Sequence, residues 1–170
     1  MKDIAGRAGV SVMTVSKALR DAKDISVATK ARIGYLPEES YLYRFLNPGE
    51  TLDFFGSLFQ IDSAERRRRA EQLIEMVGLN QARTRTVGEF SKGMQRRIGI
   101  AQALVNDPDL IILDEPTAGL DPKQIIETRQ LIKGLAGDHT IILSTHILPR
   151  SEEHTSELQS LAYLVCRLLL

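Results

Sequence analysis

The feature that most constrains the fold is a run of four apolar residues, 110–113, that leads directly into Asp114-Glu115-Pro116. Apolar runs without polar alternation are typical of strands that are buried on both faces of a parallel sheet. A carboxylate at the carboxyl end of such a strand lies where open α/β sheets bind their ligands. There, one carboxylate can hold Mg²⁺ and its neighbour can orient an attacking water, although an acidic turn after a buried strand is sometimes incidental.

A second strand and two helices are predicted around this run. Residues 140–145 form another apolar stretch, which is followed by His146. Asp121 begins a capping-box pattern that extends to Gln124 and predicts the start of a helix. Upstream, Ser91 can cap another helix, whose N-terminus is a ready anion site. Each motif alone has a purely structural explanation, and it is their order and spacing that make the pattern specific.

In this order, residues 33–148 resemble the ATPase domain of ABC transporters. The motifs that carry the resemblance are the signature sequence at 91–94, the Walker B strand at 110–116, the D-loop at 118–121 and the switch histidine His146. The resemblance implies an incomplete P-loop NTPase (ABC ATPase) fold of the α/β class over residues 33–149. Residues 46–90, with the basic run 66–69 on a solvated face, match the helical subdomain that docks on a membrane partner.

The resemblance also implies a role for each matching residue. Glu115 would polarise the attacking water, His146 would contact the γ-phosphate, and Asp114 would coordinate Mg²⁺ through a water molecule. Ser91 and Gly93 would clamp ATP that is held by a partner subunit. The residues implied to bind ATP are Glu38, which stands where most members have the Q-loop glutamine, Ser91, Lys92, Gly93, Met94 and Asp121.

The same resemblance implies ATP and Mg²⁺ as cofactors. It implies an ABC transmembrane subunit and a second ATPase subunit as partners. The implied location is cytoplasmic, and peripheral at the inner face of the cell membrane when the chain is assembled with a transporter.

One family motif, a G-x-x-G-x-G-K-[ST] loop upstream of Glu38, does not occur in the 170 residues. The backbone amides of that loop cradle the phosphates, and its lysine reaches the β- and γ-phosphates. The aromatic segment that stacks on adenine, and the strand that would pair with residues 140–144, are also not found. We therefore predict that this chain does not bind MgATP in its own site and that its signature can act only on the ATP of another subunit. The strand at 140–144 should have an unpaired, aggregation-prone edge, and whether the chain is an enzyme is left open.

Residues 1–32 differ from the rest, because they carry seven Lys or Arg and only three Asp. Gly9 suits a turn between two short helices, and the second helix has an apolar stripe opposite a basic polar face. Such a pair can read the DNA major groove, although a basic three-helix fragment need not bind DNA. The stretch AGVSVMTVSKAL resembles the helix-turn-helix headpiece of lactose-repressor-type (LacI-like) transcription factors. Without a hinge helix and a dimerising domain, only weak, salt-sensitive DNA binding is expected. The residues implied to contact DNA are Ser11, Val12, Met13, Thr14, Ser16, Lys17 and Arg20.

Residues 150–170 differ again and read RSEEHTSELQSLAYLVCRLLL. They resemble the in-frame translation of a common short-read sequencing adapter, and the alternative is a natural amphipathic helix, because five apolar residues have helical spacing. Residues 34–37 fit both the repressor and the ABC pattern, which suggests a chimeric sequence joined at that point. Three interpretations stay open: a fragment of an ABC transporter ATP-binding subunit whose family couples ATP hydrolysis to export, a LacI-type transcriptional regulator, or a chimeric artefact without function.

Bulk composition adds limits rather than a function. The 22 Lys and Arg balance the 22 Asp and Glu, so the net charge provides no overall attraction to nucleic acid or an acidic membrane. The single cysteine, Cys166, excludes an internal disulfide framework and fits a reducing cytoplasm. No apolar run approaches the roughly 20 residues that span a bilayer, so we expect a soluble, intracellular chain.

Overall fold

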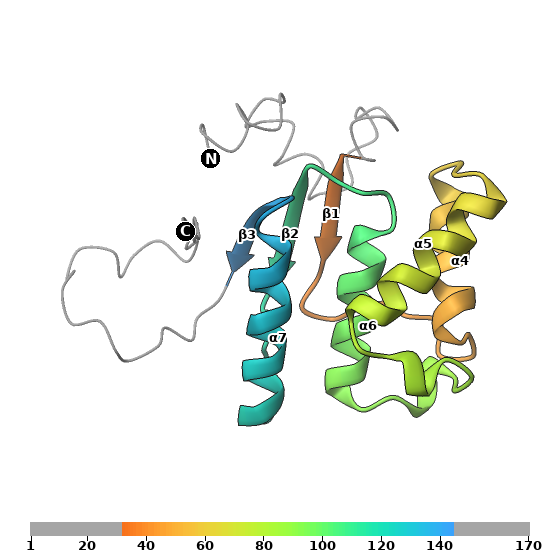
Figure 1. Cartoon of the computed structure of the whole chain (residues 1–170). Coiled ribbons are helices and arrows are strands. Elements are labelled where there is room, and N and C mark those ends of the chain that lie inside the picture. The colour runs from red at the N-terminus through yellow and green to blue at the C-terminus, as the bar shows by residue number, and fades with distance from the viewer. Residues whose placement is uncertain (1–31, 145–170) are drawn as a thin grey trace, which may run out of the picture.

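The computed structural model describes residues 32–144. In chain order its elements are β1 (Ile33–Leu36), α4 (Pro48–Leu58), α5 (Ser63–Met76), the short 3₁₀ helices Asn80–Ala82 and Val87–Glu89, α6 (Lys92–Leu104), β2 (Leu110–Asp114), α7 (Pro122–Leu135) and β3 (Thr140–Ser144). Figure 1 shows the strands side by side, with α6 next to β1, α4 and α5 beyond it, and α7 along β2 and β3.

The sheet has the order β1-β2-β3, and both strand pairs are parallel. Parallel pairing requires crossover connections, which are the α4–α6 segment and α7. The first four residues of β2 are at most 6% exposed, whereas β3 is half-buried along its length. Within residues 32–144, β3 pairs along one edge only, with β2. The predicted strands are therefore confirmed, with β2 as the buried central strand and β3 at Thr140–Ser144.

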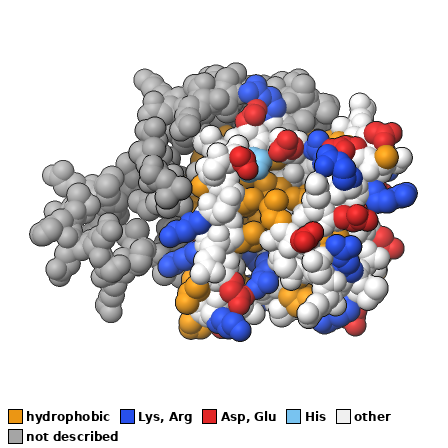
Figure 2. Space-filling view, viewed as in Figure 1, with side chains coloured by type: hydrophobic (Ala, Val, Ile, Leu, Met, Phe, Trp, Pro, Cys, Tyr) orange, Lys and Arg blue, Asp and Glu red, His pale blue; other side chains and the backbone are white. Residues whose placement is uncertain are grey.

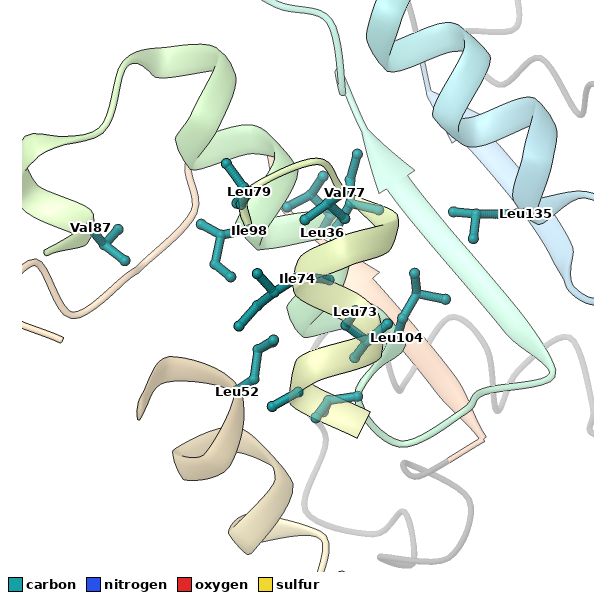
Figure 3. Packing of buried hydrophobic residues seen from close by; sticks show 14 of the residues in the cluster. Leu36, Leu52, Leu73, Ile74, Val77, Leu79, Val87, Ile98, Leu104 and Leu135 are labelled. Carbon is teal, nitrogen blue, oxygen red and sulfur yellow. The ribbon is translucent and has the colours of Figure 1, made fainter. Parts of the chain in front are cut away.

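The helices α4, α5 and α6 share one apolar core with the sheet. Leu52 of α4, Ile74 of α5 and Ile98 of α6 belong to this core and lie close together in Figure 3. Leu36 joins it from the end of β1, and Leu135 extends from α7 toward the sheet in the same view. The core thus connects the helices that follow β1 to the strands that carry the predicted site.

Local sequence signals decide where the helices begin. Asn47 opens α4 with a complete capping box, because its side chain accepts from Glu50 N at 3.0 Å and the Glu50 carboxylate accepts from Asn47 N at 2.9 Å. Asp62, Ser91 and Asp121 precede α5, α6 and α7, and each side chain accepts a hydrogen bond from a backbone N–H of the first turn. The caps predicted at Ser91 and Asp121 are confirmed.

The second half of the capping box predicted at Asp121 is not formed. Asp121 Oδ1 accepts from Gln124 N at 2.9 Å, as the pattern predicts. The Gln124 side chain, however, lies against Gly93 of α6, so close that a Cβ on Gly93 would be 2.7 Å from the Gln124 Cδ atom. The glycine leaves a space at the contact between α6 and α7, and the glutamine side chain fills it.

The basic run 66–69 is not a uniformly solvated face. Arg66 pairs with Asp53 of α4 at 2.8 Å, and its side chain packs against Gly56. Arg69 donates to the Val105 carbonyl at 3.2 Å. The prediction of a solvated face is wrong for these two arginines, because helical spacing turns them toward α4 and the end of α6.

The outer surface of the described residues carries both charged and hydrophobic side chains. Figure 2 shows Lys, Arg, Asp and Glu spread over the helices, and hydrophobic side chains gathered between α7 and the α5–α6 side of the molecule. None of the helices within residues 32–144 has both the length and the apolar character needed to cross a bilayer.

Candidate functional site

The acidic end of β2 has an unusual backbone conformation. Asp114 is the half-buried last residue of β2 and is in register with Ser144 of β3. Glu115 follows with a φ of 45°, in the left-handed region that residues other than glycine seldom adopt. Its amide donates to the Ser144 carbonyl at 3.0 Å, and its carbonyl accepts from Ala118 N at 3.0 Å. Strained residues of this kind concentrate at functional sites, and Glu115, although charged, is only 8% exposed.

A buried arginine connects this end of the sheet to the segment after β1. Arg96 of α6 is 5% exposed, and its guanidinium donates to the Pro37 carbonyl at 2.9 Å and to the Glu38 carbonyl at 2.8 Å. Burial lowers the pKa of the Arg96 guanidinium, while attraction to the carboxylates of Glu38, Asp114 and Glu115 opposes that shift. Glu38 and the two acidic residues after β2 therefore share one electrostatic neighbourhood with Arg96.

Sequence reasoning missed Arg96, although a signal for it exists. Arg96 stands three, four and seven residues before Gly99, Ile100 and Ala103, which are all buried on α6. A charged residue at a position of an apolar helix stripe indicates a specific buried interaction, because an unpaired buried charge is costly. The identity of its partners is not visible in the sequence, since they lie 58 and 59 residues earlier in the chain.

The signature residues form the first turn of α6. Ser91 Oγ accepts from Met94 N at 3.3 Å, and both Ser91 and Lys92 are exposed. Gly93 is buried under the Gln124 side chain, and Lys92 lies so close to Gly119 that a Cβ there would overlap the Lys92 ammonium group. Gly119 has a φ of 67°, which glycine adopts without strain. The signature turn thus packs directly on the loop that leads into α7.

The structure places the predicted site residues in two groups. The first group joins Ser91, Lys92, Gly93 and Met94 to the start of α7, which Asp121 caps. The second group joins Glu38 to Asp114 and Glu115 through Arg96. His146 and the seven residues predicted to contact DNA lie outside the described residues, as does the segment 150–170.

The acidic end of β2 fits a magnesium ion whose other ligands come from outside the protein. Within the described range, no three His, Cys, Asp or Glu side chains come together at one point. Magnesium in nucleotide enzymes is usually bound by one or two carboxylates, several waters and substrate phosphates. Asp114, at the open end of the central strand, suits the role of the single carboxylate.

A group of aromatic side chains that the sequence analysis did not predict lies near the 3₁₀ helix Val87–Glu89. Tyr43 packs against Phe45 and Phe54 with ring centroids 5.9 and 5.2 Å apart, and Phe45 is 74% exposed. The same stretch is joined to the 3₁₀ helix before the signature, because Val87 N donates to the Leu46 carbonyl at 2.8 Å. We call Tyr43, Phe45 and Phe54 the aromatic surface.

A parallel sheet with an acidic turn after its central strand, next to a serine-capped helix, defines an α/β protein with a candidate ligand site at the carboxyl end of the sheet. The family model described as ABC transporter matches residues 5–118, about two thirds of the chain, and the chain belongs to this family. The match includes most of residues 1–32.

The chain is similar to an uncharacterized ABC transporter ATP-binding protein, sll0415, of Synechocystis sp., at 45% identity over 137 residues. That alignment covers 79% of this chain and 39% of the relative. The bacitracin transport ATP-binding protein BcrA of Bacillus licheniformis is 41% identical over 124 residues, which are 72% of this chain and 40% of BcrA. This chain therefore spans about 40% of the length of these relatives.

A solved structure, the dimeric post-hydrolysis state of the ATP-binding cassette MJ0796 bound to ADP and Pi, has a similar fold. Its TM-score is 0.63 at 27% identity, and the match covers 74% of this chain and 59% of that chain. The ABC transporter ATP-binding family thus accounts for the sheet and its helices. The DNA contacts expected at residues 11–20 stay a prediction.

Proposed function

We propose that this chain is part of the ATP-binding subunit of an ABC exporter, in which ATP hydrolysis drives transport. The observation that carries the proposal is the turn at Glu115, a buried carboxylate held in a left-handed conformation directly after Asp114. The relative named for bacitracin transport supports a small-molecule cargo for the assembled transporter. ATP and Mg²⁺ are the cofactors that this activity requires.

The roles proposed for the residues at this end of the sheet are those that the resemblance to ABC ATPases implies. Asp114 would hold Mg²⁺ through water, and Glu115 would polarise the water that attacks the γ-phosphate. His146, two residues beyond β3, contacts the γ-phosphate. The hydrogen bond from Glu115 N to Ser144 O supports this arrangement, because it joins the turn after β2 to the end of β3.

The signature turn acts on ATP that another subunit holds. The first turn of α6 presents unpaired backbone N–H groups and the helix dipole, which favour a phosphate. Ser91 and Lys92 are exposed there, so we assign the clamp on the nucleotide to Ser91 and the Gly93 backbone, while Lys92, Met94 and Asp121 complete the contact surface. In this proposal, the phosphate-binding loop that holds this ATP belongs to the partner subunit.

A matched pair of cap variants tests this proposal. The 170-residue chain is mixed with a full-length relative, such as the Synechocystis protein, and association is measured by sedimentation with and without MgATP. We expect association only with MgATP, and Ser91→Ala should weaken it about tenfold because a phosphate ligand is lost. Asp62→Ala removes the corresponding cap of α5, far from the signature, and should leave association unchanged. Association that ignores MgATP or the Ser91 change would contradict the proposal.

The chain alone provides a second test. Without a phosphate-binding loop it should not bind MgATP at micromolar concentrations and should not release phosphate. Micromolar binding, or a phosphate release that Glu115→Gln abolishes, would overturn the assignment of the loop to a partner subunit.

We place the transmembrane partner on the aromatic surface. Tyr43 and Phe45 pack on each other and are 45% and 74% exposed, and large apolar groups that are exposed together mark interaction sites. The hydrogen bond from Val87 N to Leu46 O gives this surface a backbone connection to the 3₁₀ helix that precedes the signature turn. Assembly there locates the chain at the cytoplasmic face of the membrane.

DNA binding by residues 1–32 is the second candidate function, and the motif AGVSVMTVSKAL with its excess of Lys and Arg favours it. Binding to a palindromic operator should be weak and should fall steeply with salt. Lys17→Ala should reduce it further, whereas Lys133→Ala on α7 removes an equal charge elsewhere and should not. Operator binding with no response to salt or to Lys17 would exclude this candidate.

The third candidate is a chimeric sequence without function of its own, favoured by the adapter-like character of residues 150–170 and by the shared stretch 34–37. Long-read sequencing of the source DNA across codons 32–37 and 148–151 decides it. One unbroken native read through a junction removes the proposal at that junction.

A further inference from the structure

Arg96 makes a connection that no local signal requires. Its guanidinium is buried and donates to two consecutive carbonyl groups, those of Pro37 and Glu38, at 2.9 and 2.8 Å. Two parallel bonds from one planar fork fix direction as well as distance, which a lysine ammonium cannot do. The segment directly after β1 is therefore held to the middle of α6.

Close helix–strand packing fixes where that fork lies. Gly99 of α6 faces the end of β1, where a Cβ would be 2.6 Å from Leu36 Cδ1 and 3.1 Å from Ser40 Oγ. Two residues before Leu36 in β1, Gly34 lies so close to α6 that a Cβ would overlap the Ala103 carbonyl oxygen. Both contacts lack room for a side chain, so α6 packs closely against β1 at these two points.

The two ends of this connection are the two groups of the candidate site. Ser91, which caps α6, lies five residues before Arg96 on the same helix, and Glu38 carries one of the carbonyls that Arg96 holds. The charges of Glu38, Asp114 and Glu115 all act on the Arg96 guanidinium. A shift of the signature turn along the axis of α6 therefore displaces the Arg96 fork from the Glu38 backbone.

We propose that Arg96 is a positioning residue that links the signature turn to Glu38, so that a change at either end is transmitted through the two guanidinium–carbonyl bonds. The roles of Glu38 and Ser91 toward nucleotide rest on the proposed function, whereas the link itself does not. Arg96 touches no reacting group and acts through the backbone of Pro37 and Glu38.

Hydrogen–deuterium exchange on the intact chain, without nucleotide, tests the link. Exchange is followed in peptides that cover residues 37–44, residues 90–96 and, as an internal reference, the β2 residues 110–114. Arg96→Met keeps the bulk of the side chain and removes the donors, and it should raise exchange about tenfold in the first two peptides and leave β2 unchanged. Arg96→Lys keeps the charge without the fork and should give an intermediate increase in 37–44.

Arg97→Met is the matched control. Arg97 is the next residue of α6, but it pairs with Glu127 of α7 and not with the segment after β1. It should leave exchange in 37–44 unchanged.

The link would be overturned if Arg96→Met left exchange in 37–44 unchanged. It would also be overturned if exchange in β2 rose equally, because that result would indicate a general loss of stability. If Arg96→Met does not fold, the test rests on Arg96→Lys. Exchange in 37–44 that is the same in Arg96→Lys as in the wild type would then overturn the proposal that the two guanidinium bonds are needed. These outcomes are independent of the Ser91→Ala association assay, so failure of the link and failure of the proposed function are distinguishable.

Discussion

The strands β2 and β3 carry the same three apolar residues in the same register but differ in how deeply these residues are buried. Residues 111–113 and 141–143 are both Ile-Ile-Leu, and the pairs lie directly opposite one another. In β2 they are at most 6% exposed, while in β3 all are half-buried. Since sequence and partner register are shared, the difference comes from position: β2 lies between two strands, and β3 is paired on one edge within residues 32–144.

The comparison also explains where the chemistry is. Asp114 and Ser144 end the two strands in register, and only the central strand continues into an acidic turn. A carboxylate at the end of the central strand has β1 and β3 on both sides, so the groups that follow all three strands can reach it. At the edge strand a small hydroxyl residue suffices, and its carbonyl serves to hold the Glu115 turn.

The largest expected effect is a stability difference between equivalent leucines. Leu113→Ala removes a fully buried side chain and should cost about 2–5 kcal/mol of unfolding free energy, because a cavity remains. Leu143→Ala, at the matching position of β3, should cost less than about half of that, because its side chain is already partly hydrated. Urea unfolding of both variants measures the difference. Equal losses would show that the second edge of β3 is covered as well as the edge of β2.

The second-largest effect is a stability difference between two glycines, Gly34 in β1, which is the other neighbour of β2, and Gly134 in α7. Gly34→Ala should destabilise the chain by about 1–3 kcal/mol, because the new methyl group would overlap the Ala103 carbonyl oxygen of α6. Gly134→Ala on α7 has nothing within 4 Å and should instead stabilise by about 0.5–1 kcal/mol, since alanine favours a helix interior. Thermal unfolding of both variants gives the sign of each change. A neutral Gly34→Ala would mean that α6 can move away from β1, which would also weaken the argument for Arg96.

Sequence patterns predict those features of the fold that depend on residues close together in the chain. The apolar runs and the caps at Ser91 and Asp121 locate β2, β3, α6 and α7 because periodicity and capping are local signals. The half-burial of β3 is not predictable in this way, since its Ile-Ile-Leu is identical to that of β2 and only topology separates them. The same holds for the Arg96 bonds, which join residues 58 and 59 positions apart.

Motif order identifies the acidic turn and the signature, but not what packs on them. Gln124 fills the space over Gly93 rather than closing its own cap, because α6 and α7 meet there. The left-handed conformation of Glu115 follows from its hydrogen bond to β3, which the residues 110–116 alone do not contain.

The smallest expected effect is on α5, at the ion pairs of Glu65 with Arg68 and Arg69, whose side chains are partly exposed. Hydrogen bonds from Arg68 and Arg69 hold the pKa of the Glu65 carboxyl at about 2, below its ordinary value of 4.5. A pKa lowered on folding contributes stability above the unfolded value, and this contribution is lost as the pH falls from 4.5 toward 2. The contribution should be slight, because exposed ion pairs are screened by solvent and salt.

Carbon-13 NMR titration of the Glu65 carboxyl checks this value, and the double change Arg68→Ala with Arg69→Ala should return the pKa toward 4.5. Arg67→Ala lies on the same helix and is the control, because Arg67 is exposed and the Glu65 carboxylate is bonded by Arg68 and Arg69. Urea unfolding at pH 7 and pH 3 should show a far smaller change for the double variant than for Leu143→Ala. If the double variant lost as much unfolding free energy as Leu143→Ala, burial would not determine the relative size of the stability losses in β2, β3 and α5.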